Sequence, residues 1–244
     1  MMTQTVQTIY NAINDWAPFD SMESWDKGGL ELGDWDKPVS SALVALEIDS
    51  GLCRRLLETP VDLVWVHHPI FFKPLSQLRY TSDMGRIIHA FMQHSTALIS
   101  SHTNLDIAPG GVNDTFITHY GLDPQNGTAL KGGHGQCFYD INMSVQELQA
   151  RQGARVVGAK QDRLNHLVVA CGSGHGSVRA AAEAGIDGIL TGELTYHDEQ
   201  FCAFNGITAL VVGHKESEEL VIPVMADTLR AVDPTLQVDL VPLS

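Results

Sequence analysis

The sequence contains two adjacent histidines, His67 and His68, at the end of an apolar run within VDLVWVHHPIFFKP. Imidazole nitrogens bind transition-metal ions and transfer protons near neutral pH. The β-branched and aromatic residues at 61–66 predict a strand buried on both faces, and Pro69 should end its pairing. Open α/β sheets bind their ligands at the carboxyl ends of such strands. The histidine pair is therefore a candidate metal site.

Three further predicted strands end in side chains of the same kind. These side chains, each just beyond a strand, are His102, Asp106, Glu193, His197, His214 and Glu218. Because His214 and Glu218 are four residues apart, a helix that begins after Gly213 would place both on one face. Histidines and carboxylates that recur at the carboxyl ends of parallel strands predict a metal site.

Each candidate also has a structural interpretation. A single histidine is commonly a hydrogen-bonded structural residue. Asp106 could cap the turn before Pro109, and Glu218 could be a solvated carboxylate on a helix. The histidines that fall outside the pattern, on predicted surfaces and helices, are His89, His94, His119 and His166. The joint pattern, rather than any one residue, favours metal binding.

The adjacent histidines also bear on the number of ions. Successive side chains diverge from an extended backbone, so His67 and His68 serve two neighbouring ions more easily than one. Carboxylates can bridge or terminate such a pair, and two-metal sites hold their ions roughly 3.5 to 4 Å apart. Imidazole and carboxylate ligands suit zinc, iron or manganese. We therefore expect two divalent ions per chain.

The elements that must position these residues alternate between strand and helix, which predicts a mostly parallel α/β sheet covered on both faces. Helices are expected over 6–16, 50–58, 85–94, 112–119, 144–152, 178–184 and 219–231, and strands over 42–48, 61–66, 96–100, 165–171, 188–191, 207–212 and 236–240. The segment WDKGGLELGD is expected to be a loop. A shift to Gly, Asn and Lys near 124–135 predicts two lobes, 1–125 and 126–244.

One glycine-rich turn leaves two interpretations open. The turn from Gly172 to Gly176 precedes a predicted helix and could present backbone N–H groups to an anion. It lacks the order of a dinucleotide-binding fingerprint, so a plain tight turn is an equal alternative.

Composition limits the classes of partner. A net charge of −14 over 244 residues argues against a general nucleic-acid surface, which requires clustered Lys and Arg. No apolar run is long enough for a membrane span, and no secretory signal is evident, so we expect a cytoplasmic protein without membrane contact. The cysteines are widely spaced and include no CxxC pair, which favours core positions over a thiolate zinc site.

The chain resembles the GTP cyclohydrolase I type 2 homologue family, also called the NGG-interacting-factor-three-like dinuclear metal-centre proteins. The matching stretches are WDKGGLELG, HHPIFF, SSHTNLDIAPGGVND, TGELTYHD and GHKESEE, in family order and across nearly the whole chain. The combination of these stretches is highly specific for the family.

The resemblance implies a duplicated fold of two similar three-layer α/β/α lobes, which together form one family-level domain. It implies a dinuclear metal site between the lobes and assembly into a toroidal homohexamer. The family ligands fall on His67, His68, Asp106, His214 and Glu218, with Glu218 as the bridge. His102 and His197 match motif positions near the metals, where the resemblance makes them candidate catalytic residues that either support the ligands from behind or transfer protons.

Two functions follow as hypotheses. The first is a metal-dependent hydrolase that acts on a nucleotide or related small molecule, in which the metals activate water. The family label suggests hydrolytic opening of the guanine ring of GTP. The second is a non-catalytic metal-binding scaffold or regulatory ring protein. An open coordination position favours the enzyme, and a closed ligand set favours the scaffold.

Two positions depart from the family pattern. Lys27 stands where the family more often has asparagine, and Glu193 stands where aspartate is common. Neither is among the five implied ligands, so these departures concern substrate contacts rather than metal binding.

Overall fold

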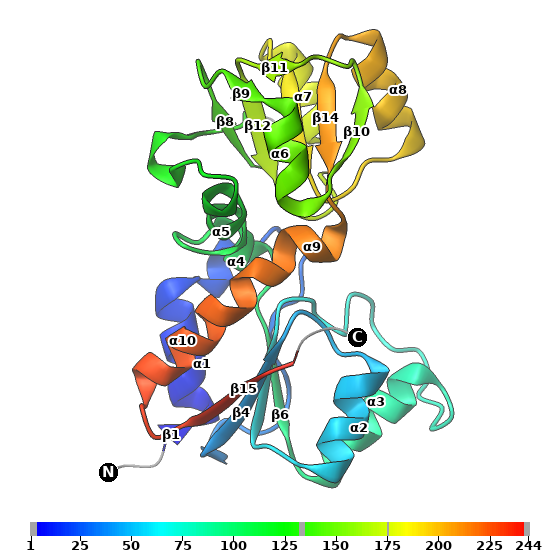
Figure 1. Ribbon diagram of the computed structural model, residues 1–244. Coiled ribbons are helices and arrows are strands. Elements are labelled where there is room, and N and C mark those ends of the chain that lie inside the picture. Colours follow the sequence, from blue (N-terminus) through cyan, green and yellow to red (C-terminus); the bar gives the residue numbers. More distant parts are fainter. Residues whose placement is uncertain (1–3, 132–134, 175, 242–244) are drawn as a thin grey trace. The chain divides into compact units, whose positions relative to one another are not determined.

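The chain forms two compact α/β units, seen in a computed structural model that describes residues 4–131, 135–174 and 176–241 (Figure 1). The first unit joins Met1–Gly111 to Ile222–Ser244, and the second is the continuous segment Val112–Val221. The helices in these described ranges are all too short or too polar to cross a membrane.

The first unit contains a five-stranded sheet with helices on both faces. Its elements are β1 (Gln4–Thr5), α1 (Val6–Trp16), η1 (Phe19–Ser21), β2 (Gly29–Leu32), β3 (Pro38–Val39), β4 (Ser41–Ala45), α2 (Ser50–Glu58), β5 (Leu63–Val66), α3 (Asp83–Gln93), β6 (Ala97–Ser100), α4 (Thr103–Ile107), α10 (Ile222–Val232) and β15 (Gln237–Leu240). Helices α1 and α10 cover one face of the sheet, and α2 and α3 cover the other (Figure 1).

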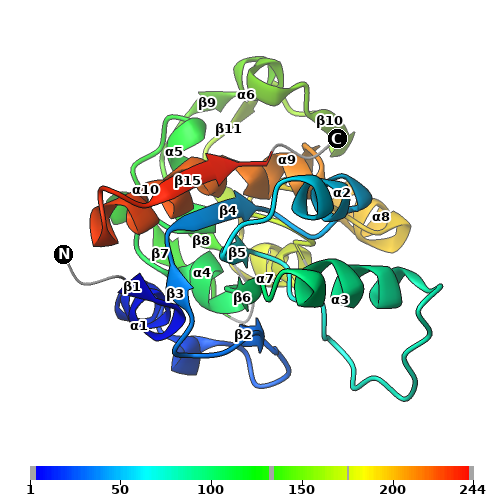
Figure 2. The same cartoon turned by 90° about the horizontal axis from the view of Figure 1, so that it is seen from below.

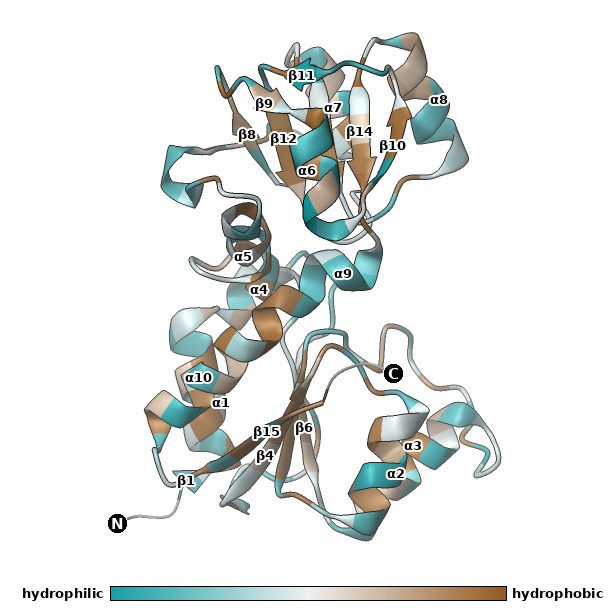
Figure 3. Ribbon diagram, in the orientation of Figure 1, coloured by the Kyte–Doolittle hydropathy of each residue, from teal (hydrophilic) through white to brown (hydrophobic). Residues whose placement is uncertain are grey.

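Hydrophobic strands explain this arrangement. The strands follow the order β15-β4-β5-β6-β2, in which β15, β4, β5 and β6 are parallel and β2 pairs antiparallel with β6. Every residue of β5 is buried, as expected for a parallel strand that lies between two helical layers. Figure 2 shows β4, β5 and β6 next to one another, and Figure 3 shows β4 and β6 as mainly hydrophobic strands between the helices of the unit.

The second unit has the same layered construction. Its elements are α5 (Val112–His119), η2 (Pro124–Asn126), β7 (Thr128–Ala129), β8 (Gln136–Phe138), β9 (Met143–Ser144), α6 (Val145–Gln152), β10 (Arg155–Gly158), β11 (Arg163–Leu164), β12 (Leu167–Ala170), α7 (Ser177–Glu183), β13 (Gly188–Thr191), α8 (Tyr196–Phe204), β14 (Thr208–Val211), α9 (His214–Glu218) and η3 (Glu219–Val221). The main sheet has the order β10-β14-β13-β12-β8-β7, with a parallel centre of β12, β13 and β14 and antiparallel edges.

Alternate residues of the strands pack into two separate hydrophobic cores in this unit. Val169 and Leu190 pack in a core with residues of α5 and α6, whereas Val168 and Ile189 pack in a core with residues of α7 and α8. Because successive side chains of a strand point to opposite faces, one strand serves both helical layers. Each unit is thus a three-layer α/β/α structure, and the predicted fold class of two such lobes is confirmed at the level of the fold.

Most of the predicted elements are present. Helices α1, α2 and α5 and strand β13 have the predicted bounds, and Ser144 caps α6 by accepting a hydrogen bond from the Glu147 backbone N–H. The loop prediction for WDKGGLELGD was wrong in part, because Gly29–Leu32 forms β2 and completes the sheet beside β6. Glycine and aspartate lower strand propensity, but pairing with a buried neighbour outweighs that local preference.

The boundaries of the two units differ from those of the lobes expected at 1–125 and 126–244. Helix α5 belongs to the second unit, and the carboxyl-terminal α10 and β15 return to the first. The composition shift near residue 124 instead falls on η2 and β7, inside the second unit, although residues 132–134 of that stretch lie outside the described ranges.

Candidate metal centre

The carboxyl ends of the parallel strands in the first unit are level with one another. Ala45 of β4 pairs with Val66 of β5, and Val66 pairs with Ser100 of β6. Residues one or two positions beyond these strands therefore emerge at the same edge of the sheet. They include Glu47, His67 and His68, and His102.

His67 is completely buried at this edge, and its tautomer is fixed by the backbone. Its Nδ1 lies 2.9 Å from the carbonyl oxygen of Ser101. A carbonyl only accepts, so Nδ1 carries the proton and Nε2 holds the lone pair. Nε2 lies 3.7 Å from Oδ1 of Asp106 in α4. The ring thus presents a ligand nitrogen beside a carboxylate oxygen.

His102 is oriented in the same way by a carboxylate. Its Nδ1 lies 2.9 Å from Oδ1 of Asp26, whose Oδ2 accepts hydrogen bonds from the backbone N–H and the hydroxyl of Thr103, at 3.0 and 2.5 Å. Burial opposes ionisation of Asp26, but the hydrogen bonds from His102 and Thr103 outweigh it and hold its pKa well below the usual range. An ionised Asp26 requires a proton on Nδ1, which leaves Nε2 of His102 as the acceptor or ligand atom.

His68 completes a group of three imidazoles. Its Nδ1 lies 3.5 Å from Oε2 of Glu47, and the backbone N–H groups of His67 and His68 both donate to the carbonyl of Leu46. Ring centroids lie 4.9 Å apart for His67 and His68, 5.2 Å for His67 and His102, and 5.6 Å for His68 and His102. One ligand atom from each ring lies within 4.8 Å of the others, a spacing that suits metal coordination.

The second unit repeats this arrangement at its own sheet edge. Ala170 pairs with Thr191 across β12 and β13, and Thr191 pairs with Val211 across β13 and β14. Gly172, Glu193 and Gly213 each lie two residues beyond one of these strands. His214 then begins α9. The candidate ligands of the second unit thus also follow the carboxyl ends of its parallel strands.

His214 lies between two carboxylates of its own unit. Its Nε2 lies 3.2 Å from Oε2 of Glu218 one turn later in α9, and its Nδ1 lies 3.4 Å from Oε2 of Glu193. The hydrogen bond with Glu218 and, to a smaller extent, Glu193 raise the pKa of His214 to about 9, although burial opposes the charged form. The two carboxylates therefore favour a positive charge at the position of the His214 ring.

Glycines allow the backbone to approach this pair closely. Gly172 has a φ of +62°, and a Cβ there would lie 2.3 Å from Oε1 of Glu218 and 3.5 Å from Nε2 of His214. The Gly172 N–H donates to the Ser217 hydroxyl at 2.9 Å, and that hydroxyl donates to the His214 carbonyl at 2.7 Å. The glycine turn, in which His175 is outside the described residues, thus packs against α9.

The predicted residues therefore gather within their own units. His67, His68, His102 and Asp106 lie together in the first, and His214 and Glu218 lie together in the second, with Glu193 as a further neighbour. His197 differs: it is exposed in the first turn of α8, and its ring lies 5.5 Å from that of Tyr196. No group of three potential ligands that the described residues form includes His197.

Two carboxylates at the site were not predicted. Glu47 follows β4 by two residues, so the rule that identified the histidines could have identified it as well. Asp26 lies in the segment before β2 and is hydrogen-bonded to His102, which is 76 positions later in the sequence. No local pattern indicates such a contact.

Imidazoles and carboxylates grouped at the carboxyl ends of parallel strands define a candidate metalloprotein built from two α/β units. Its family is shown by the sequence as a whole. The chain belongs to the Duf34/NIF3 (NGG1p interacting factor 3) family, whose family model matches residues 4–244.

Curated relatives carry a common name. A "GTP cyclohydrolase 1 type 2 homolog" of Clostridium acetobutylicum is 28% identical over 243 residues, covering 94% of this chain and 91% of the relative. A protein of the same name from Streptococcus pneumoniae is also 28% identical, covering 84% of this chain and 83% of the relative.

Solved structures support the fold. A Bacillus cereus protein related to NIF3 has a TM-score of 0.89 at 18% identity and covers 100% of this chain and 98% of its own. Reduced HcgD from Methanocaldococcus jannaschii has a TM-score of 0.87 at 24% identity, with both chains covered completely, at 100% each. At these identities the likeness concerns the fold alone.

Proposed function

We propose that the chain is a metal-dependent hydrolase that holds two divalent ions and acts on a nucleotide or related small molecule. The observation that carries the proposal is the group of three imidazoles in the first unit, in which one ligand atom of each ring lies within 4.8 Å of the others. His67 and His68 would hold metal, and His102 would move protons beside it. In His67 and His102 a backbone carbonyl and a carboxylate fix the proton on Nδ1, so that Nε2 carries the lone pair. Oriented imidazoles of this kind are typical of metal sites.

The ligands that we propose are the five that the sequence motifs assign: His67, His68, Asp106, His214 and Glu218. The donors in each unit fit a divalent cation, since imidazole nitrogens stand beside carboxylate oxygens. The assignment of both sets of donors to one pair of ions comes from the motifs. Zinc, iron and manganese all suit such ligands.

Metal ions held in this way supply Lewis acidity that activates water and polarises the group under attack. The protein's own residues supply proton transfer. Because Asp26 holds the proton on Nδ1 of His102, Nε2 can accept a proton from water or return one to a leaving group. His197 remains a second proposed proton-transfer residue that would act only when substrate reaches the start of α8.

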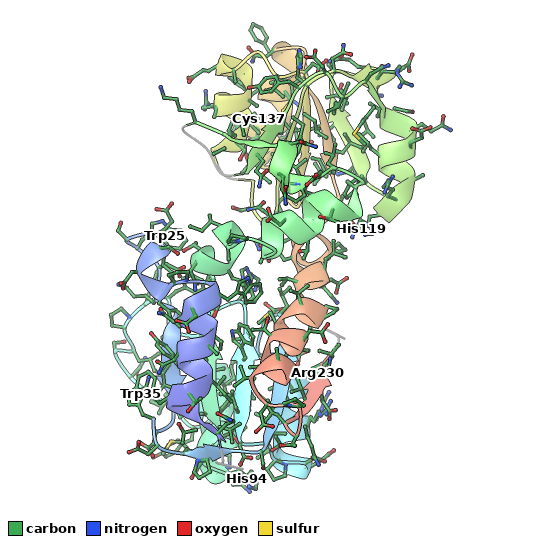
Figure 4. All side chains as sticks on the ribbon, turned by 90° about the vertical axis from the view of Figure 1, so that its left-hand side faces the viewer. Trp25, Trp35, His94, His119, Cys137 and Arg230 are labelled. Atoms are coloured by element: carbon green, nitrogen blue, oxygen red, sulfur yellow. The ribbon has the colours of Figure 1, made fainter. Side chains whose placement is uncertain are left out.

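The substrate class is proposed from the relatives' names. Their shared name, GTP cyclohydrolase 1 type 2 homolog, makes GTP and other nucleotides the first compounds to test. Hydrolysis of a nucleotide panel by metal-reconstituted protein is expected, with loss of at least about 100-fold in His67→Ala and in Glu218→Ala. His94→Ala is the control, because His94 precedes β6 whereas His102 follows it. Figure 4 shows His94 at the opposite end of the first unit from Trp25, whose ring neighbours that of His102.

Elemental analysis gives an independent measurement. Wild-type protein purified without chelator should contain two divalent ions per chain, and the variant in either unit should contain fewer. Activity that persists in both variants would contradict the hydrolase mechanism. Metal binding without turnover of any compound would instead support a metal-binding scaffold.

We also propose that the chain assembles as a homohexamer in the cytoplasm. Large apolar side chains remain exposed in the single chain, among them Phe204 at 91% and Met92 at 70%. Exposed apolar side chains of this size are typical of surfaces that contact another protein. Light scattering should give six times the chain mass of 26.6 kDa, and a monomer mass would rule the hexamer out.

A further inference from the structure

Two exposed aromatic side chains border the imidazole group of the first unit. The ring centroid of Trp25 lies 5.9 Å from that of His102, and the ring centroid of Phe72 lies 5.5 Å from it. Both rings stand steeply to the imidazole, at 76° and 88°. Trp25 is 54% exposed and Phe72 is 47% exposed. Two rings from separate loops thus flank one candidate catalytic histidine and still present aromatic surface to solvent.

The other indoles near this site have structural partners. The Trp65 indole N–H donates to the Ser101 hydroxyl at 2.9 Å, and the side chain is completely buried. The Trp16 indole N–H donates to the carbonyl of Pro109 at 2.8 Å. Trp25 and Phe72 differ because about half of the surface of each is exposed to solvent. Two exposed rings that border the same imidazole favour contact with a ligand more than a single exposed apolar side chain would.

The loops that carry the two rings are anchored. Phe72 follows Phe71, whose backbone N–H donates to the Glu31 carboxylate of β2 at 3.0 Å, as does that of Ile70. Trp25 precedes Asp26, which is held by His102 and Thr103. Rings on anchored backbone lose less conformational freedom when a ligand binds, which favours their use as fixed stacking surfaces.

Cationic side chains accompany both rings in the sequence. Lys27 lies two residues after Trp25, and Lys73 lies directly after Phe72. Both lysines are exposed in a chain of net charge −14. Ammonium groups attract phosphates and other anions, and aromatic rings stack on planar heterocycles.

We propose that Trp25 and Phe72 bind the planar ring of an anionic heterocycle, of the nucleotide class, and hold it beside His102. The inference rests on the proposed function and assigns two specificity-determining residues to it. Trp25 and Phe72 would supply the stacking surfaces, and Lys27 and Lys73, which are exposed on the same two loops, would attract the negative charge.

The test is equilibrium binding to the full-length, zinc-loaded protein. The probes are the four nucleoside monophosphates GMP, AMP, CMP and UMP, together with ribose 5-phosphate, which lacks a base. Trp25→Ala and Phe72→Ala should each raise the Kd of the best nucleotide by about 5- to 100-fold. The Kd of ribose 5-phosphate should change by less than about twofold, because it makes no stacking contact.

Matched variants separate stacking from general damage. Tyr80→Ala removes an aromatic side chain that is 84% exposed in the same loop as Phe72, and should leave the Kd unchanged. Trp25→Phe keeps a ring and should retain most of the affinity. If stacking on Trp25 quenches its fluorescence in the wild type, the variant should lose that quenching. Metal content should equal that of wild type in every variant.

The outcomes distinguish this inference from the proposed function. Failure of all four nucleotides to bind, or a Kd that Trp25→Ala and Phe72→Ala leave unchanged, overturns the ring site even if hydrolysis occurs. Ring-dependent binding without turnover supports the ring site and counts against the hydrolase.

Discussion

At the scale of single residues, the first unit uses hydrogen-bond acceptors to decide which nitrogen of each histidine faces the site. The Ser101 carbonyl accepts a hydrogen bond from Nδ1 of His67, and the Asp26 carboxylate accepts one from Nδ1 of His102. Both rings therefore present Nε2 to the site. This orientation costs no side-chain freedom when a ligand arrives, because it already exists in the folded chain. The acceptors are therefore as important to the chemistry as the rings.

The Asp26 carboxylate provides the first prediction. In Asp26→Asn the amide can donate to Nδ1 of His102, which would move the ring proton to Nε2 and remove the proposed base. We expect kcat to fall by about 10- to 100-fold while metal content stays at the wild-type level. Steady-state kinetics with elemental analysis checks this. Loss of metal in the variant would instead identify His102 as a ligand.

Gly172 provides the second prediction at this scale. Gly172→Ala would place a methyl group 2.3 Å from Oε1 of Glu218 and would also strain a backbone with φ of +62°. Gly185→Ala is the control, since Gly185 has φ of +71° and nothing within 4 Å of a Cβ. Both variants should lose about 1 kcal/mol of stability through backbone strain, and only Gly172→Ala should also lose metal. Denaturation and elemental analysis measure the two effects, and equal metal content in both variants would refute the steric argument.

At the scale of elements, the level carboxyl ends of the parallel strands explain how much of the site was predictable. His67, His102 and His214 follow strands whose hydrophobic pattern is strong, and parallel pairing aligns those strand ends. Once the strands were predicted, it followed that the histidines after them would lie at the same sheet edge within each unit. Asp26 was missed because it depends on the tertiary pairing of β2 with β6, which its glycine-rich sequence does not indicate.

At the amino ends of the strands, each unit has an aspartate that accepts hydrogen bonds from the backbone of a neighbouring strand. Asp62 precedes β5 and accepts hydrogen bonds from the backbone N–H groups of Ser40 and Ser41 at 2.9 and 3.1 Å. Asp187 precedes β13 and accepts from the backbone N–H groups of Asn165 and His166 at 3.1 and 2.8 Å. Each aspartate thus joins two neighbouring parallel strands at the edge away from the metal ligands. The repetition agrees with the duplicated fold that the family resemblance implies.

Asp62 gives the prediction at this scale. Burial raises its pKa, but the hydrogen bonds from Ser40 and Ser41 and the charge of Lys37 outweigh burial, so the folded pKa is lowered. The ionised group therefore stabilises the fold above the unfolded pKa of about 3.9, and this contribution is lost as pH falls through the folded value. Asp62→Ala should cost about 1 to 3 kcal/mol at pH 7, and the difference from wild type should shrink below about pH 4.

Urea denaturation at several pH values measures that difference. Asp227→Ala is the control, because Asp227 forms an exposed pair with Arg230 at 2.8 Å and should cost less than about 0.5 kcal/mol. A cost for Asp62→Ala that is the same at pH 7 and pH 3 would show that ionisation of Asp62 contributes nothing.

At the scale of the whole molecule, the chain crosses from the first unit to the second and back. Local patterns located α10 and β15 correctly to within a few residues but gave no indication of the unit to which they belong. That assignment depends on the pairing of β15 with β4, in which partner residues such as Val238 and Ala42 lie 196 positions apart. Helix α10 contributes Met225 and Leu229, both completely buried, to the same unit.

The discontinuous first unit leads to the last prediction. A fragment of residues 112–221 has its own sheet and two cores, so it should fold alone with a cooperative thermal transition. A fragment of residues 1–111 lacks α10 and β15, which leaves β4 as an open edge and uncovers the surfaces of α1 and β4 against which α10 packs. It should aggregate, whereas the same fragment joined to 222–244 by a flexible Gly-Ser linker should fold. Circular dichroism and light scattering distinguish these outcomes, and a soluble, cooperatively folded 1–111 fragment would show that the carboxyl-terminal segment is dispensable for the first unit.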